Sequence, residues 1–66
     1  MLPTQFEQGV LYAAGLIVRL HDQPTIAADI VREAGLGSIN ISSMDSYEQE
    51  TLKKLKGEKG ISFPGV

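Results

Sequence analysis

The sequence predicts a small all-α fold, a single three-helix domain over residues 1–66 with a short extended C-terminal tail over 57–66. Three observations predict it. Apolar residues recur at helical spacing in three segments, two of these begin at a capping pattern, and proline or glycine stands at their boundaries.

The first helix is expected over about residues 5–21. Thr4 and Glu7 form the Thr-x-x-Glu pattern of a capping box, and the segment before Pro24 ends the helix because a residue before proline disfavours helical backbone. This helix is apolar on two faces, about 100° apart. The first face consists of Phe6, Val10, Ala13, Ile17 and Leu20. The second consists of Leu11, Ala14 and Val18.

The second helix is expected over about residues 24–34, with Pro24 in its first turn and one apolar arc that includes Ile26 and Ile30. Gly35 reads as the left-handed residue after it, with Leu36 folding back as its apolar contact.

Between the second and third helices, residues 37–43 are expected to form a loop that Ile39 and Ile41 anchor to the core. The third helix is expected over about residues 46–56, because Asp45 followed by Glu48 is the acidic analogue of a capping box. Ser43 is a rival N-cap. In the tail, Phe63 either packs back on the core or is a free anchor.

The expected core follows from these helices. It consists of Phe6, Val10, Ile17, Leu20, Ile26, Ile30, Leu52 and Leu55. A core this small barely offsets the entropy of folding, so small domains often add disulfides, a metal or a partner subunit. The chain has no Cys and one His, which excludes disulfides and a Cys/His zinc site. Oligomerisation or very good helix packing remains.

The second face of the first helix is the predicted interface of a homodimer. Leu11, Ala14 and Val18 have the spacing of a helix-pairing seam, and Tyr12 and Gly15 lie beside it. The main rival explanation is that the 37–43 loop or the Phe63 tail of the same chain covers this face.

Charge is divided along the chain. The net charge is −2, but residues 51–66 are basic, with four lysines against Glu58. These candidate phosphate contacts are Lys53, Lys54, Lys56 and Lys59. They are interpreted as solvated residues at a helix end that complement the helix dipole, and the alternative is a site for nucleic acid or an acidic partner.

No pattern indicates an enzyme. His21 is expected to cap or pack near the end of the first helix, the carboxylates lack metal-ligand spacing, and no glycine-rich phosphate loop is present. The sequence therefore predicts no catalytic residues, no cofactor and no metal.

The uncharged apolar run over 9–18 is half the length of a membrane span, and residues 1–7 lack a basic region, so a cytoplasmic protein without membrane partners is expected.

Three segments, 3–14, 23–30 and 44–52, resemble small accessory proteins of tailed phages and prophages of enteric bacteria. The resemblance implies the cytoplasm of a bacterial host cell and a host or phage protein as partner, and it carries no catalytic residues. The sequence thus predicts a non-catalytic protein-interaction module that forms a homodimer through its first helix. The alternative is a small nucleic-acid-binding regulator that uses the basic C-terminal helix.

Overall fold

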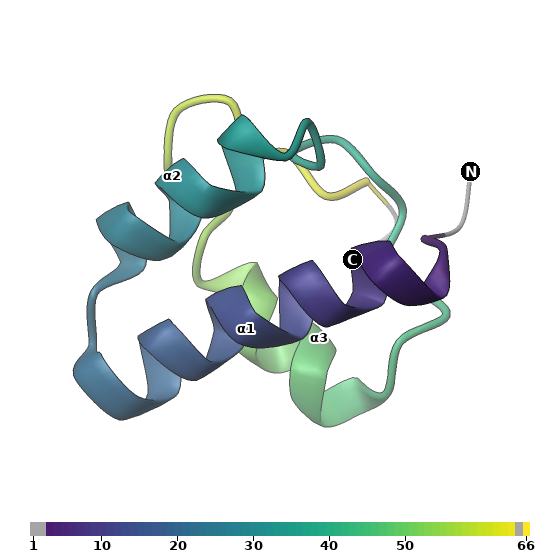
Figure 1. Cartoon of the computed structure of the whole chain (residues 1–66), viewed down its shortest axis with the longest axis horizontal. Helices are drawn as coiled ribbons and strands as arrows, with labels where there is room; N and C mark the ends of the chain where they lie inside the picture. The colour runs from purple at the N-terminus through teal and green to yellow at the C-terminus, as the bar shows by residue number, and fades with distance from the viewer. Residues whose placement is uncertain (1–2, 65) are drawn as a thin grey trace.

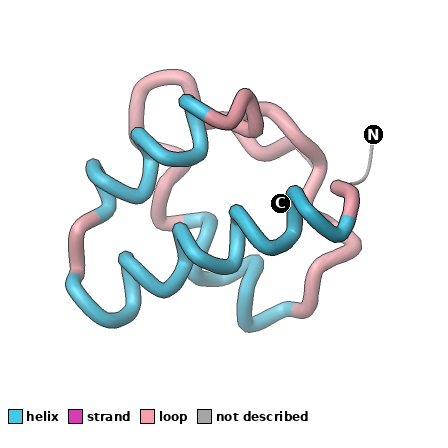
Figure 2. The backbone as a smooth tube through the Cα atoms, in the orientation of Figure 1, coloured by secondary structure: helices cyan, strands magenta, loops and turns pink. Residues whose placement is uncertain are grey.

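A computed structural model, which describes residues 3–64 and 66, confirms the all-α three-helix fold. The helices are α1 (Gln5–His21), α2 (Pro24–Glu33) and α3 (Ser46–Lys53). In Figure 1, α2 turns back alongside α1, and α3 lies behind α1. Figure 2 shows that loops connect these helices and form the rest of the chain, with no strand in the described part.

The ends of α1 follow from local interactions. The Thr4 hydroxyl accepts a hydrogen bond from the Glu7 backbone N–H at 3.1 Å, and the Glu7 carboxylate accepts one from the Thr4 N–H at 2.8 Å. This reciprocal pair is the predicted capping box, and it satisfies two N–H groups that the helix leaves free. At the other end, Asp22 adopts left-handed backbone with φ of 51° and ends the helix before Pro24.

The C-terminal cap of α2 also forms as predicted. Gly35 has φ of 74°, its N–H donates to the Arg32 carbonyl, and the Leu36 N–H donates to the Val31 carbonyl. This is a Schellman motif, and it returns the Leu36 side chain to the core, where it is buried. The helix itself ends at Glu33, one residue before the predicted boundary.

The third helix is shorter than predicted. The Asp45 side chain accepts the Glu48 N–H at 2.9 Å, so Asp45 is the N-cap and the rival Ser43 is not. The regular helix ends at Lys53 and not at residue 56. After it, the Leu55 N–H donates to the Leu52 carbonyl, in the tighter i to i−3 pattern, and the backbone continues as turns.

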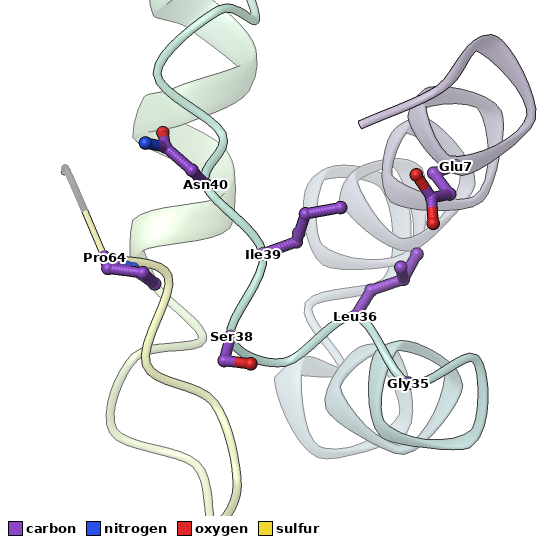
Figure 3. Close-up of a pocket in the computed structure, with 7 residues that line it drawn as sticks. All are labelled: Glu7, Gly35, Leu36, Ser38, Ile39, Asn40 and Pro64. Carbon is purple, nitrogen blue, oxygen red and sulfur yellow. The ribbon is translucent and has the colours of Figure 1, made fainter. Parts of the chain in front are cut away.

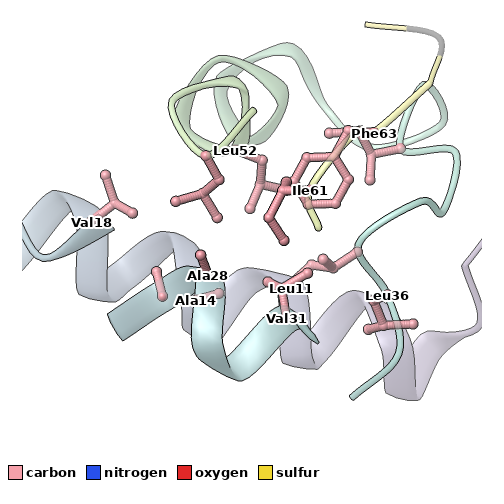
Figure 4. Close-up of a cluster of buried hydrophobic side chains, with 12 residues drawn as sticks. Leu11, Ala14, Val18, Ala28, Val31, Leu36, Leu52, Ile61 and Phe63 are labelled. Atoms are coloured by element: carbon pink, nitrogen blue, oxygen red, sulfur yellow. The ribbon is translucent and has the colours of Figure 1, made fainter. Parts of the chain in front are cut away.

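The loop and the tail close the core over α1 and α2. Ile41 and Phe63 are fully buried, and Figure 4 shows Phe63 and Ile61 among leucines and alanines of the three helices. One carbonyl connects the two segments, because the Gly37 oxygen accepts the Ser62 N–H at 2.7 Å and the Phe63 N–H at 3.1 Å. The expectation that the loop is anchored by isoleucines is confirmed, and Phe63 packs inward.

The predicted core was wrong for much of α1. Leu52 and Leu55 are fully buried as expected, and Val10, Ile17 and Ile30 are half-buried. Phe6 and Leu20, in contrast, are mostly exposed, and Ile26 is half exposed. The physical reason is that α1 presents its other apolar face inward. The buried core side chains are Leu11, Ala14, Val18, Ala27, Ala28, Val31, Leu36, Ile41, Leu52, Leu55, Ile61 and Phe63.

No helix within residues 3–64 and 66 has both the length and the apolar character needed to cross a membrane.

Candidate interaction surface

The predicted dimer seam lies inside the molecule. Leu11 and Ala14 are fully buried and Val18 is 5% exposed, so this face of α1 is not available to a partner. The alternative that the sequence left open, in which the loop and the tail of the same chain cover this face, accounts for the burial, because both segments pack in this core. The prediction that these three residues form an interface was therefore wrong.

The two neighbours of that seam occupy different environments. Gly15 is buried where α1 meets α3. A Cβ added at this position would lie 3.4 Å from a Glu48 carboxylate oxygen and 3.5 Å from the Thr51 methyl carbon, which shows how closely α3 approaches. Gly15 therefore permits a close helix crossing and does not face a partner. Tyr12 is half exposed at the edge between α1 and α3.

An ion pair fixes that edge. The Arg19 guanidinium donates to the Glu48 carboxylate at 2.9 Å and to the Thr51 hydroxyl at 3.2 Å. Its central carbon lies 4.9 Å from the Tyr47 ring centre and 5.7 Å from that of Tyr12, within range of cation–π attraction. Arg19 thus connects α1 to α3, and its charge is paired with that of Glu48.

The side of α1 opposite the core is apolar and open. Five residues at successive intervals of three, four, three and four lie along it, and we call them the outer stripe: Phe6, Gly9, Ala13, Leu16 and Leu20. Phe6 is 80% exposed and Leu20 69%, Gly9 and Ala13 are exposed, and Leu16 is half-buried. No charged side chain occurs between Glu7 and Arg19, so the stripe is uninterrupted.

A second apolar row lies on α2. Ile26, Ile30 and the C-cap residue Ala34 recur every four residues along one flank of α2, and we call them the α2 row. On the opposite flank, Arg32 donates to the Lys59 carbonyl at 2.7 Å, so the α2 row lies on the side away from the tail. α1 and α2 pack side by side (Figure 1), and we refer to the stripe and the row together as the outer face.

The α2 row borders a shallow hollow of 460 Å³. Its lining includes Ile30, Ala34 and two carboxylates, Asp29 and Glu33. Asp29 is ion-paired with Arg32 on the same helix. The outer face therefore has an acidic edge along α2 and an apolar centre.

A second hollow is lined mainly by groups that stabilise the fold. This hollow of 400 Å³ lies between the start of α1, residues 35–40 and Pro64, and in Figure 3 its Leu36 and Ile39 side chains point toward α1. Its Glu7 carboxylate is already used in the helix cap, and the Asn40 side-chain oxygen accepts the Ser42 N–H at 2.8 Å. These two polar side chains thus serve the fold.

No candidate metal site forms in the described part of the chain. No group of three or more His, Asp or Glu side chains in that part could hold a metal ion. The single imidazole, His21, is exposed in the last turn of α1, where a cation would complement the helix dipole.

The four lysines lie on the surface, and three of them follow α3 in turns. Lys53 lies 3.6 Å from the Glu50 carboxylate, and the Lys56 amine donates to the Val66 carbonyl. The predicted basic C-terminal helix is therefore a single helical lysine followed by an irregular basic segment.

Comparison of the chain with protein-family models, with curated proteins and with solved structures finds no match. The resemblance to phage accessory proteins stays a prediction from the sequence.

The sequence missed the outer face, although its spacing was readable. The sequence predicts Phe6 and Leu20 in the core because they share a face with Val10 and Ile17, and Ala13 lies on that same face. The intervals of three and four from Phe6 to Leu20 match a pairing seam at least as well as the one predicted.

Proposed function

We propose that this chain is a non-catalytic protein-interaction module that uses its outer face as the docking surface. One observation supports this most strongly. The longest helix presents an uncharged apolar stripe to solvent while its opposite side already fills the core. Monomeric proteins rarely expose large contiguous apolar patches, and larger ones mark interaction sites.

The energetic argument rests on the two most exposed side chains of the stripe. Phe6 and Leu20 leave 80% and 69% of their surface in water. Full burial of a Phe or Leu side chain is worth about 1.5–3 kcal/mol. Covering both residues with a partner therefore supplies several kcal/mol toward the cost of association.

The resemblance to small phage proteins gives this module its proposed context. It favours the bacterial cytoplasm as the site of action and a host or phage protein as a further partner. The acidic edge formed by Asp29 and Glu33 favours partner groups that are not acidic directly opposite that edge.

The test compares two variants that each add one negative charge. Leu20→Glu places the charge on the outer stripe, and Ser46→Glu places it on the exposed first residue of α3, where an acidic residue favours the helix. Both variants should fold, because both positions are exposed.

We expect proteins captured from bacterial lysate by the native chain to be retained by Ser46→Glu and lost by Leu20→Glu. Circular dichroism provides the control for folding. Identical capture by all three chains would contradict the proposal.

Nucleic-acid binding is the second candidate, because four exposed lysines occur within residues 53–59. Changing Lys53 and Lys56 to Gln should alter stability by well under ~1 kcal/mol, since exposed ion pairs contribute little. We expect no tight DNA binding by the native chain in a salt series. Strong binding that weakens steeply with salt, and that the two changes reduce, would favour this candidate instead.

A further inference from the structure

We infer that the outer face pairs with a second copy of this chain, with the two α1 helices antiparallel and the two-fold axis near the middle of α1. This inference rests on the proposed function and names the partner of the same surface. It also replaces the predicted seam, Leu11, Ala14 and Val18, with the opposite side of the helix.

The sizes of the residues in the outer stripe favour an antiparallel orientation of the two helices. The stripe has small residues at Gly9 and Ala13, and toward its C-terminal end it has large residues at Leu16 and Leu20. An antiparallel pair with its axis between Ala13 and Leu16 sets Leu16 of one copy against Ala13 of the other. The same register sets Leu20 against Gly9, so large residues meet small ones in both layers.

The space to receive a leucine exists at Gly9. A Cβ at Gly9 would meet nothing within 4 Å, so the notch on the helix surface is not filled by the chain itself. A parallel pair would set Gly9 against Gly9 and leave a void between the helices. It would also set Leu16 against Leu16 and Leu20 against Leu20, which would crowd these side chains. Antiparallel helices also oppose their dipoles favourably.

Self-complementarity favours a second copy over an unrelated partner. A two-fold interface requires one surface patch to fit itself. The stripe meets this requirement because it supplies both the leucines and the small residues that receive them. No charged side chain in the stripe opposes the pairing.

A dimer interface would have to cover a moderate share of the surface of the chain. A stable interface buries about 800 Å² on each partner, which is about one fifth of the 3973 Å² that this chain exposes. α1 has 17 residues and is about 25 Å long at 1.5 Å per residue. The α2 row widens the face to two helices. In this register Phe6 of one copy reaches the turn between α1 and α2 of the other, close to the half-exposed Ile26.

The first test fills the notch. Gly9→Leu adds a side chain where the folded monomer has open space, while blocking the seat of Leu20 from the second copy. Gly57→Leu is the matched control, since a Cβ at Gly57 also meets nothing within 4 Å and Gly57 lies outside the outer face. By sedimentation equilibrium, we expect Gly9→Leu to weaken dimerisation about tenfold or more and Gly57→Leu to leave it unchanged.

The second test uses the absence of cysteine from the chain. Single variants Gly9→Cys and Leu20→Cys are mixed and oxidised mildly, and each is also oxidised alone. Antiparallel pairing predicts a disulfide only between the two different variants. In the same register, two copies of Gly9 are about 16 Å apart along the helix, too far for a disulfide.

Three outcomes would overturn the inference. They are a native chain that sediments as a monomer at high micromolar concentration, equal dimerisation by Gly9→Leu, and disulfides formed by each cysteine variant alone. If the native chain is monomeric but Leu20→Glu still loses captured proteins, the docking surface stands and only the second copy fails. If Leu20→Glu loses nothing, the proposed function fails as well.

Discussion

Replacing Phe63 with alanine removes the largest of the fully buried side chains, and the structure allows its effect to be estimated. A buried Phe→Ala change costs about 3–5 kcal/mol, from lost transfer energy and the cavity left behind. A domain of 66 residues has a total stability of about 3–10 kcal/mol at typical values per residue. The substitution should therefore remove a large part of the stability, or all of it.

Phe6 provides a matched control for the same chemical change. It is 80% exposed, so Phe6→Ala should change the stability of the monomer by less than ~0.5 kcal/mol. Thermal unfolding followed by circular dichroism, at a protein concentration low enough to keep the chain monomeric, measures both. For a domain of this size, ~1 kcal/mol shifts Tm by about 4–8 °C.

We therefore expect Phe63→Ala to lower Tm by at least ~12 °C, or to leave no cooperative transition, and Phe6→Ala to shift Tm by a few degrees at most. Equal shifts for the two variants, or a larger one for Phe6→Ala, would refute the assignment of the tail to the core. They would instead support the core that the sequence predicted for α1.

Further substitutions test individual contacts. Gly37→Ala should destabilise the fold by about 1–3 kcal/mol in chemical denaturation, because its Cβ would lie 2.1 Å from the Gly60 carbonyl oxygen, which is backbone and cannot simply rotate away. Glu48→Ala should cost about 1–3 kcal/mol by removing the carboxylate that Arg19 contacts. A double-mutant cycle with Arg19→Ala should then give a coupling energy well above zero, and additive effects would count against the ion pair. Thr4→Ala should lower stability by ~1 kcal/mol through loss of the capping box, and an unchanged denaturation midpoint would contradict that role.

Much of the fold could be predicted because its boundaries depend on neighbouring residues. The capping box of Thr4 and Glu7, the N-cap Asp45 and the left-handed Gly35 each act within a few residues of the chain. Such interactions can be recognised in a sequence without knowledge of the packing. They placed α1 at its observed bounds and α2 within one residue.

The face that α1 turns inward could not be predicted in this way. Both sides of the helix are apolar, so periodicity alone gives no preference between Leu11 and Leu20. The choice depends on contacts far apart in sequence, such as the pairing of Arg19 with Glu48 and the close approach of α3 at Gly15. The candidate surface depended on the same choice. The face predicted as the dimer seam is buried, and the face predicted as core is exposed.

The end of α3 shows a similar limit. Capping and amphipathic spacing extended this helix to residue 56, but the chain tightens into turns after Lys53. Leu55 is fully buried in the resulting segment. The three-dimensional position of the core thus overrides the local helical preference of these residues.

The dependence of the core on Ile61 and Phe63 has a consequence for how this protein is made. Glu33, the last residue of α2, precedes Phe63 by 30 residues. At about 5–20 residues per second, the ribosome needs about 1.5–6 s to add them. During that time the apolar inner sides of α1 and α2 lack their cover, so the nascent chain is exposed to chaperones and to aggregation before it can fold.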